Sequence, residues 1–136
     1  MSDPEAPPRE RVFVLELPAE PPFLATARVF ASAIARQAGC QEAVVDDVKL
    51  AISEAWAAVT GSEPVGSIRL EIAREGGRLR FGVRTAGGRS GPPNGVWGEP
   101  WPGGIELVRL LFEDAELLED DLGAMARFSV ALEPGR

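Results

Sequence analysis

The sequence has no histidine, no tyrosine and a single cysteine among its 136 residues. Without histidine, neither a Ser-His or Cys-His nucleophile pair nor a His-ligated metal site can form. The lone Cys40 excludes an internal disulfide and a structural zinc site. This cysteine usage is typical of a reducing compartment, so we expect the protein to act in the cytoplasm.

Long apolar runs and excess positive charge are also lacking. No apolar stretch approaches the roughly 20 residues that a membrane-spanning helix needs, and the polar, proline-rich start does not have the pattern of a secretion signal. The formal net charge is −7, from 21 acidic and 14 basic residues, which argues against nucleic-acid and anionic-membrane partners. Hydrophobic residues make up 45% of the chain, enough for one packed core.

The hydrophobic pattern predicts one domain over residues 12–136, preceded by a disordered tail at 1–11. Because the strands come mainly in hairpins, we expect an α+β two-layer sandwich, with a mostly antiparallel sheet covered on one face by helices. The predicted elements are a strand at 12–17, helices at 21–39 and 42–60, strands at 67–73 and 78–84, a helix at 105–114, and strands at 115–121 and 124–133.

One segment, residues 87–104, has a different composition from the rest of the domain. It is rich in Gly and Pro and contains Trp97 and Trp101. Such a segment cannot form a regular element, and loops of this length are usually functional or disordered. We therefore interpret it as a lid loop.

Three stretches together resemble a known family. The first stretch, "VDDVKLAISEAWAAV", has Glu54 within an apolar helical pattern. The second, "LRFGVRTAGG", is a predicted strand that ends in glycines. The third, "GGIELVRLLFEDAEL", is a predicted helix that follows two glycines and is itself followed by acidic residues. Their order and spacing resemble the anti-sigma factor/serine-protein kinase branch of the GHKL, or Bergerat-fold, ATPases over roughly residues 12–132. The resemblance implies the histidine-kinase-like ATPase fold, with a nucleotide pocket between helices under a mobile lid.

The resemblance assigns roles to individual positions of this sequence. Glu54 matches the carboxylate that activates the attacking group or water. Ala58 stands where the family has the asparagine that holds Mg²⁺ and the phosphates. Thr85 stands where an aspartate takes the adenine amino group, Gly87 matches a glycine of that motif, and Ala124 replaces a threonine of the last strand.

The phosphate side of the implied pocket departs from the family pattern as well. Gly103 and Gly104 match the expected glycines, but Pro102 replaces the glycine before them and Arg89 replaces one in the adenine motif. Proline has no N–H to donate to a phosphate. An alanine methyl offers Mg²⁺ no oxygen ligand. We therefore interpret Glu54 as the remnant of a site that has lost its metal.

Three functions are compatible with these residues. The first is a regulatory protein-binding domain without ATP or Mg²⁺, acting by partner switching: the resemblance implies a sigma factor as partner, released when an anti-sigma antagonist of the STAS type competes, and often a homodimer. The second is an active ATP-dependent serine-protein kinase and anti-sigma factor that binds ATP and Mg²⁺ through substitutes such as Asn94 or Asp47. The third is an α+β domain whose likeness to the family is incidental.

Two further features have alternative interpretations. Trp97 and Trp101 either anchor the loop on the domain or form part of a protein interface, where Trp is enriched. In a third interpretation, one of them fills the space left by the lost adenine site. The acidic run "EDAELLEDD", from Glu113 to Asp121, is either a solvated edge or a surface for a basic partner.

Overall fold

The computed structural model describes residues 11–60, 66–86, 104–120 and 123–132. These residues form an α+β domain in the predicted order of elements. The elements are β1 (Arg11–Pro18), α1 (Pro22–Gln37), α2 (Glu42–Thr60), β2 (Ser67–Glu75), β3 (Arg78–Ala86), α3 (Gly104–Leu111), β4 (Glu116–Asp120) and β5 (Gly123–Ala131).

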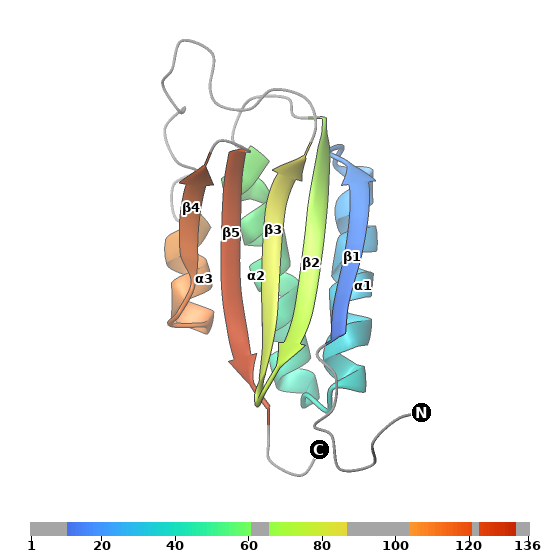
Figure 1. Cartoon of the computed structure of the whole chain (residues 1–136), viewed down its shortest axis with the longest axis vertical. Helices are drawn as coiled ribbons and strands as arrows, with labels where there is room; N and C mark the ends of the chain where they lie inside the picture. The colour runs from blue at the N-terminus through green and yellow to red at the C-terminus, as the bar shows by residue number, and fades with distance from the viewer. Residues whose placement is uncertain (1–10, 61–65, 87–103, 121–122, 133–136) are drawn as a thin grey trace, which may run out of the picture.

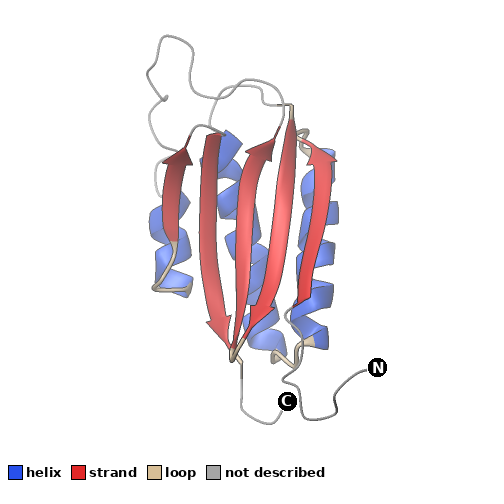
Figure 2. Cartoon of the chain, in the orientation of Figure 1, coloured by secondary structure: helices blue, strands red, loops and turns tan. Residues whose placement is uncertain are grey.

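The strands form one sheet in the order β1-β2-β3-β5-β4, and every neighbouring pair is antiparallel. The three helices lie side by side behind one face of this sheet, with α2 in the middle (Figures 1 and 2). The expectation of a two-layer sandwich with an antiparallel sheet is therefore confirmed, as is the predicted fold class.

The core lies between the sheet and the helices. In the central hairpin of β2 and β3, apolar residues alternate along each strand and face the helices, where they are at most 2% exposed: Ile68, Leu70, Ile72, Leu79, Phe81 and Val83. All three helices contribute to the other side of the core, and α2 does so through a buried stripe that includes Ile52, Ala55 and Trp56. The opposite face of the sheet carries charged side chains, as expected for an antiparallel sheet with one solvated face.

A glycine with positive φ and a hydrogen bond between side chains stabilise the junction between α1 and α2. Gly39 follows the end of α1 with a φ of 92°, a conformation that glycine adopts readily after a helix. Arg36 donates from Nε to Glu42 Oε2 at 2.9 Å, joining the end of one helix to the start of the next. This hydrogen bond lowers the pKa of Glu42 and raises the pKa of Arg36. Cys40 is partly buried there, and burial raises the pKa of its thiol.

The element ends differ slightly from the predictions. Strand β1 begins at Arg11, inside the segment expected to be tail, and β3 extends to Ala86. Gly104 is the first residue of α3, so it does not belong to the preceding loop. No helix in the described part of the chain is both long and apolar enough to span a membrane.

Candidate functional site

The fold brings several of the predicted site positions to one end of the molecule. Helix α2 and strand β3 both end there, and α3 and β5 both begin there (Figure 1). Glu54 and Ala58 lie one helical turn apart on α2, and both are partly buried. Thr85, near the end of β3, is 4% exposed, and Ala124, near the start of β5, is 3% exposed.

Thr85 is packed directly against the neighbouring strand. Gly123 has a φ of 123°, and a Cβ atom built there would lie 2.2 Å from Thr85 Oγ1. The threonine hydroxyl therefore occupies the space that a side chain at position 123 would need. Thr85 stands where the resemblance expects an aspartate that binds the adenine amino group. The close approach of Gly123 holds its buried side chain between β3 and β5.

The described residues do not fit a magnesium–triphosphate in the way that the family resemblance implies. Mg²⁺ takes oxygen ligands in near-octahedral geometry, and the side chain one turn after Glu54 is the methyl group of Ala58. Asp47, the substitute ligand considered from the sequence, lies seven residues before Glu54, which is roughly 10 Å along the helix axis. It lines a groove with the C-terminal end of α3 instead.

Several predicted residues lie outside the described part of the chain. These are Gly87, Arg89, Asn94, Trp97, Trp101, Pro102 and Gly103. The interpretations of the two tryptophans, and of Asn94 as a substitute ligand, therefore stay predictions.

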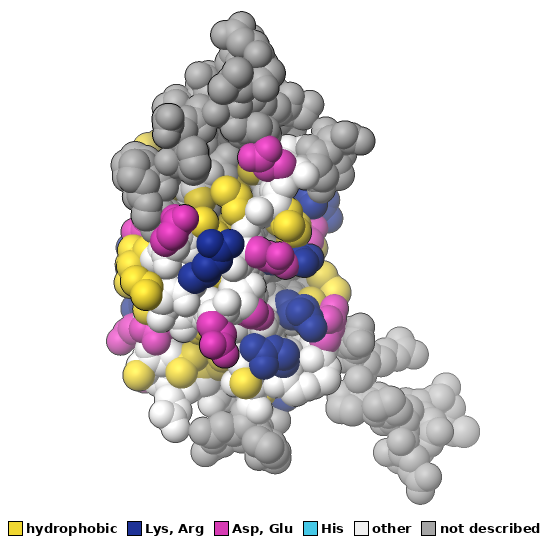
Figure 3. All heavy atoms as spheres, turned by 90° about the vertical axis from the view of Figure 1, so that its left-hand side faces the viewer, with side chains coloured by type: hydrophobic (Ala, Val, Ile, Leu, Met, Phe, Trp, Pro, Cys, Tyr) yellow, Lys and Arg dark blue, Asp and Glu magenta, His cyan; other side chains and the backbone are white. Residues whose placement is uncertain are grey.

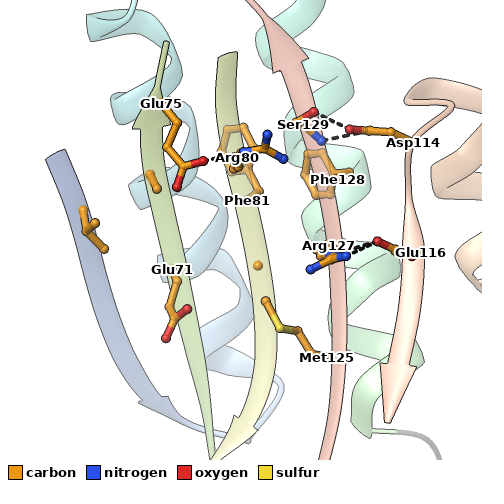
Figure 4. A pocket seen from close by; sticks show the side chains of 13 residues that line it. Glu71, Glu75, Arg80, Phe81, Asp114, Glu116, Met125, Arg127, Phe128 and Ser129 are labelled. Atoms are coloured by element: carbon orange, nitrogen blue, oxygen red, sulfur yellow. Dashed lines mark hydrogen bonds and ion pairs between the residues drawn. The ribbon is translucent and has the colours of Figure 1, made fainter. Parts of the chain in front are cut away.

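The open face of the sheet holds a cluster that sequence reasoning missed. Figure 4 shows Asp114 directed toward the adjacent Ser129 at one side of a pocket of about 550 Å³. The Ser129 N–H donates to Asp114 Oδ1 at 3.0 Å, the Ser129 hydroxyl donates to Oδ2, and Arg78 Nε donates to Ser129 Oγ at 2.9 Å. Two further ion pairs cross this face, Arg127–Glu116 and Arg80–Glu75.

These contacts change the interpretation of the acidic run. Asp114 and Glu116 are not merely solvated, because each bonds to a residue of β5. Their partners are 15 and 11 positions away in the sequence, so only the strand pairing brings them together. Since both carboxylates are paired within the domain, we assign the cluster a structural role in holding the edge of the sheet.

Replacing Asp114 with alanine tests that role. We expect the free energy of unfolding to fall by about 1–2 kcal/mol, because the N–H and hydroxyl of the buried Ser129 lose their acceptor. Asp46→Ala is the matched control: Asp46 forms an exposed ion pair with Lys49, and its loss should cost less than about 0.5 kcal/mol. Urea unfolding of both variants measures the difference, and equal losses would contradict the assignment.

Comparison with known proteins adds to this geometry. The sequence profile of the histidine kinase-like ATPase domain matches residues 17–129. Among solved structures, the chain is similar to the RsbU and RsbW domains of Rv1364c from Mycobacterium tuberculosis, with a TM-score of 0.68 and 21% sequence identity. That likeness covers 93% of this chain and 34% of the other, and at this identity it shows a shared fold. A comparison with curated protein sequences gave no significant match.

Proposed function

The chain belongs to the family of histidine kinase-like ATPase domains, and from that premise we propose that it is a regulatory protein-binding domain that has lost the Mg–ATP site. The observation that carries the proposal is the partly buried Ala58 one helical turn after Glu54. Phosphoryl transfer depends on metal ions and charged groups that neutralise the phosphates, and a methyl group supplies neither.

The adenine side of the site supports the same proposal. A buried aspartate can make a charge-assisted hydrogen bond, which contributes about 1.5–3 kcal/mol. The hydroxyl of Thr85 is packed against Gly123, and it could offer a neutral hydrogen bond at most. Weaker base recognition and a missing metal ligand reduce nucleotide affinity together, because the two effects act on one ligand.

The proposed activity is exchange between protein partners in transcription control. In this scheme the domain holds a sigma factor and releases it when a STAS-type antagonist competes for the same domain. Such exchange needs no phosphoryl transfer, because occupancy follows the concentration of each partner relative to its dissociation constant. The fold likeness to a chain with an RsbW domain is consistent with this scheme. We place the exchange in the cytoplasm.

Calorimetry with nucleotide tests the loss of the site. Titrating Mg–ATP to millimolar concentration into the purified chain is expected to give no saturable heat, and Glu54→Gln should give the same trace as the unmodified chain. A saturable isotherm that Glu54→Gln alters would contradict the proposal. Transfer of labelled phosphate from ATP to a serine of a co-purified partner would restore the kinase interpretation.

The partner is tested separately from the nucleotide. Affinity capture from the native cytoplasm, followed by mass spectrometry, is expected to recover a sigma factor or a STAS-domain protein. Recovered candidates are then purified and titrated against the chain. If neither class binds, partner switching is wrong even if the nucleotide site is inactive.

A further inference from the structure

A groove of about 430 Å³ is lined by the N-terminal half of α2, by the C-terminal end of α3 with the segment that follows it, and by the residues where β5 ends and β3 begins. It is at the opposite end of these helices from the ends that approach Thr85 and Ala124 (Figure 1). The groove is therefore separate from the candidate nucleotide site, and every residue that lines it lies in the described part of the chain.

The apolar part of the groove is built around an unusually exposed leucine. Leu110 is 83% exposed, although α3 is short and already buries Ile105 and Val108 against the core. Val44, Leu111 and Phe112 line the groove beside it and are partly buried. Figure 3 shows hydrophobic side chains gathered at mid-height on the helix side of the molecule, at its left edge.

A single exposed leucine is common on protein surfaces, but this one borders a concave site with further apolar side chains. Covering a leucine removes apolar surface from water, which favours binding. The geometry therefore offers a docking ligand an apolar anchor together with a cavity to fill.

The charged residues of the groove favour one kind of occupant. The lining holds three carboxylates and two guanidinium groups. Arg78 pairs with Asp114, and Arg109 donates from Nε to the carbonyl oxygen of Ala115 at 2.9 Å. Within the described part of the chain, Asp47 and Glu113 form no ion pair. One carboxylate thus comes from α2 and the other from just beyond α3, and both can receive a cation.

We propose that this groove docks an amphipathic α-helix of a protein partner whose apolar face is flanked by lysine or arginine. Anchors spaced at i, i+3 or i+4 along such a helix would seat between Val44 and Leu110, as in other helix-in-groove complexes. The flanking cations would reach Asp47 and Glu113. The inference rests on the proposed protein-binding function and adds to it a surface and a partner chemistry.

A pair of synthetic peptides of about 18 residues, or five helical turns, provides the test. Both carry the same leucine face; one has lysines and the other has glutamates on the polar face. At physiological salt, which screens diffuse attraction to the net negative chain, fluorescence anisotropy should show binding of the lysine peptide. Chemical-shift changes in the labelled protein should cluster at Val44, Asp47 and Leu110.

The variant Leu110→Gln, which removes the apolar anchor without adding charge, should weaken binding of the lysine peptide at least ten-fold. Val29→Gln is the matched control, because Val29 is 67% exposed on α1, on the far side of α2 from α3 (Figure 1). It should change affinity by less than two-fold. Circular dichroism and melting curves of both variants establish that each is folded, since both positions are exposed.

Three results would overturn the proposal: equal affinity of the lysine peptide for both variants, equal binding of the glutamate peptide, or chemical-shift changes confined to other surfaces. Self-association abolished by Leu110→Gln would also overturn it and assign the groove to a second copy. Mg–ATP binding concerns the other end of α2. Failure of the nucleotide proposal and failure of this one are therefore distinguishable.

Discussion

Phe128→Ala is expected to lower the free energy of unfolding by about 3–5 kcal/mol. Phe128 is the middle ring of a column of three, with centroids 4.9 Å from Phe81 and 4.8 Å from Phe112. It is 3% exposed and joins β3 to β5 and to the segment that follows α3. Truncation removes both stacking contacts and leaves a cavity between the sheet and the helices, which costs more than the lost transfer free energy alone.

Phe128→Leu is the control for volume. Leucine fills most of the space but cannot stack, so we expect a loss of about 1–2 kcal/mol. Urea unfolding gives both values, and the alanine variant should also melt roughly 10–20 °C lower than the unmodified chain. If the alanine and leucine variants lose the same stability, stacking in the ring column does not stabilise the contact between β3, β5 and the segment after α3 as the structure indicates.

The layers of the fold could be predicted because each depends on a local pattern. Ile68, Leu70 and Ile72 alternate with charged residues, so the inner face of β2 is evident without knowledge of its neighbours. The turn at Gly76 then fixes β3 as its antiparallel partner. Helix α2 was predicted with the bounds that it has, because its apolar stripe has helical spacing over many turns.

Contacts between distant segments could not be predicted in the same way. In the sequence, Asp114 and Glu116 belong to an acidic run that any solvated edge could contain. Their role appears only when β5 lies beside β4 and brings Ser129 and Arg127 within hydrogen-bonding distance. Leu110 is only a weak sequence indication of an exposed apolar site. It is an apolar residue on a short helix that already has other apolar residues to bury in the core.

The candidate nucleotide site was predicted from resemblance rather than from periodicity. Glu54 and Ala58 were placed together by the helical turn, and the structure confirms that both are on α2. That Thr85 packs against Gly123 could not have been inferred, because it requires the approach of β3 and β5 and the unusual backbone of the glycine.

This contact is the basis of the second large effect that we expect. Gly123→Ala should lower the free energy of unfolding by about 2–4 kcal/mol, because a φ of 123° is unfavourable for alanine and the new methyl group would meet Thr85 Oγ1. Gly77→Ala is the control, since a Cβ there has no atom within 4 Å. That variant should stay within about 1 kcal/mol of the unmodified chain.

A double-mutant cycle with Thr85→Ala separates the two causes. Removing the hydroxyl relieves the steric conflict but leaves the backbone strain, so Gly123→Ala should cost about 1–2 kcal/mol less in the Thr85→Ala background. Additive losses would show that Thr85 can move aside without cost. The threonine would then be free to turn toward a ligand, which would weaken the case that the adenine side of this site has been lost. Strong coupling would instead support a hydroxyl fixed between two strands, at the position where nucleotide recognition would require a carboxylate.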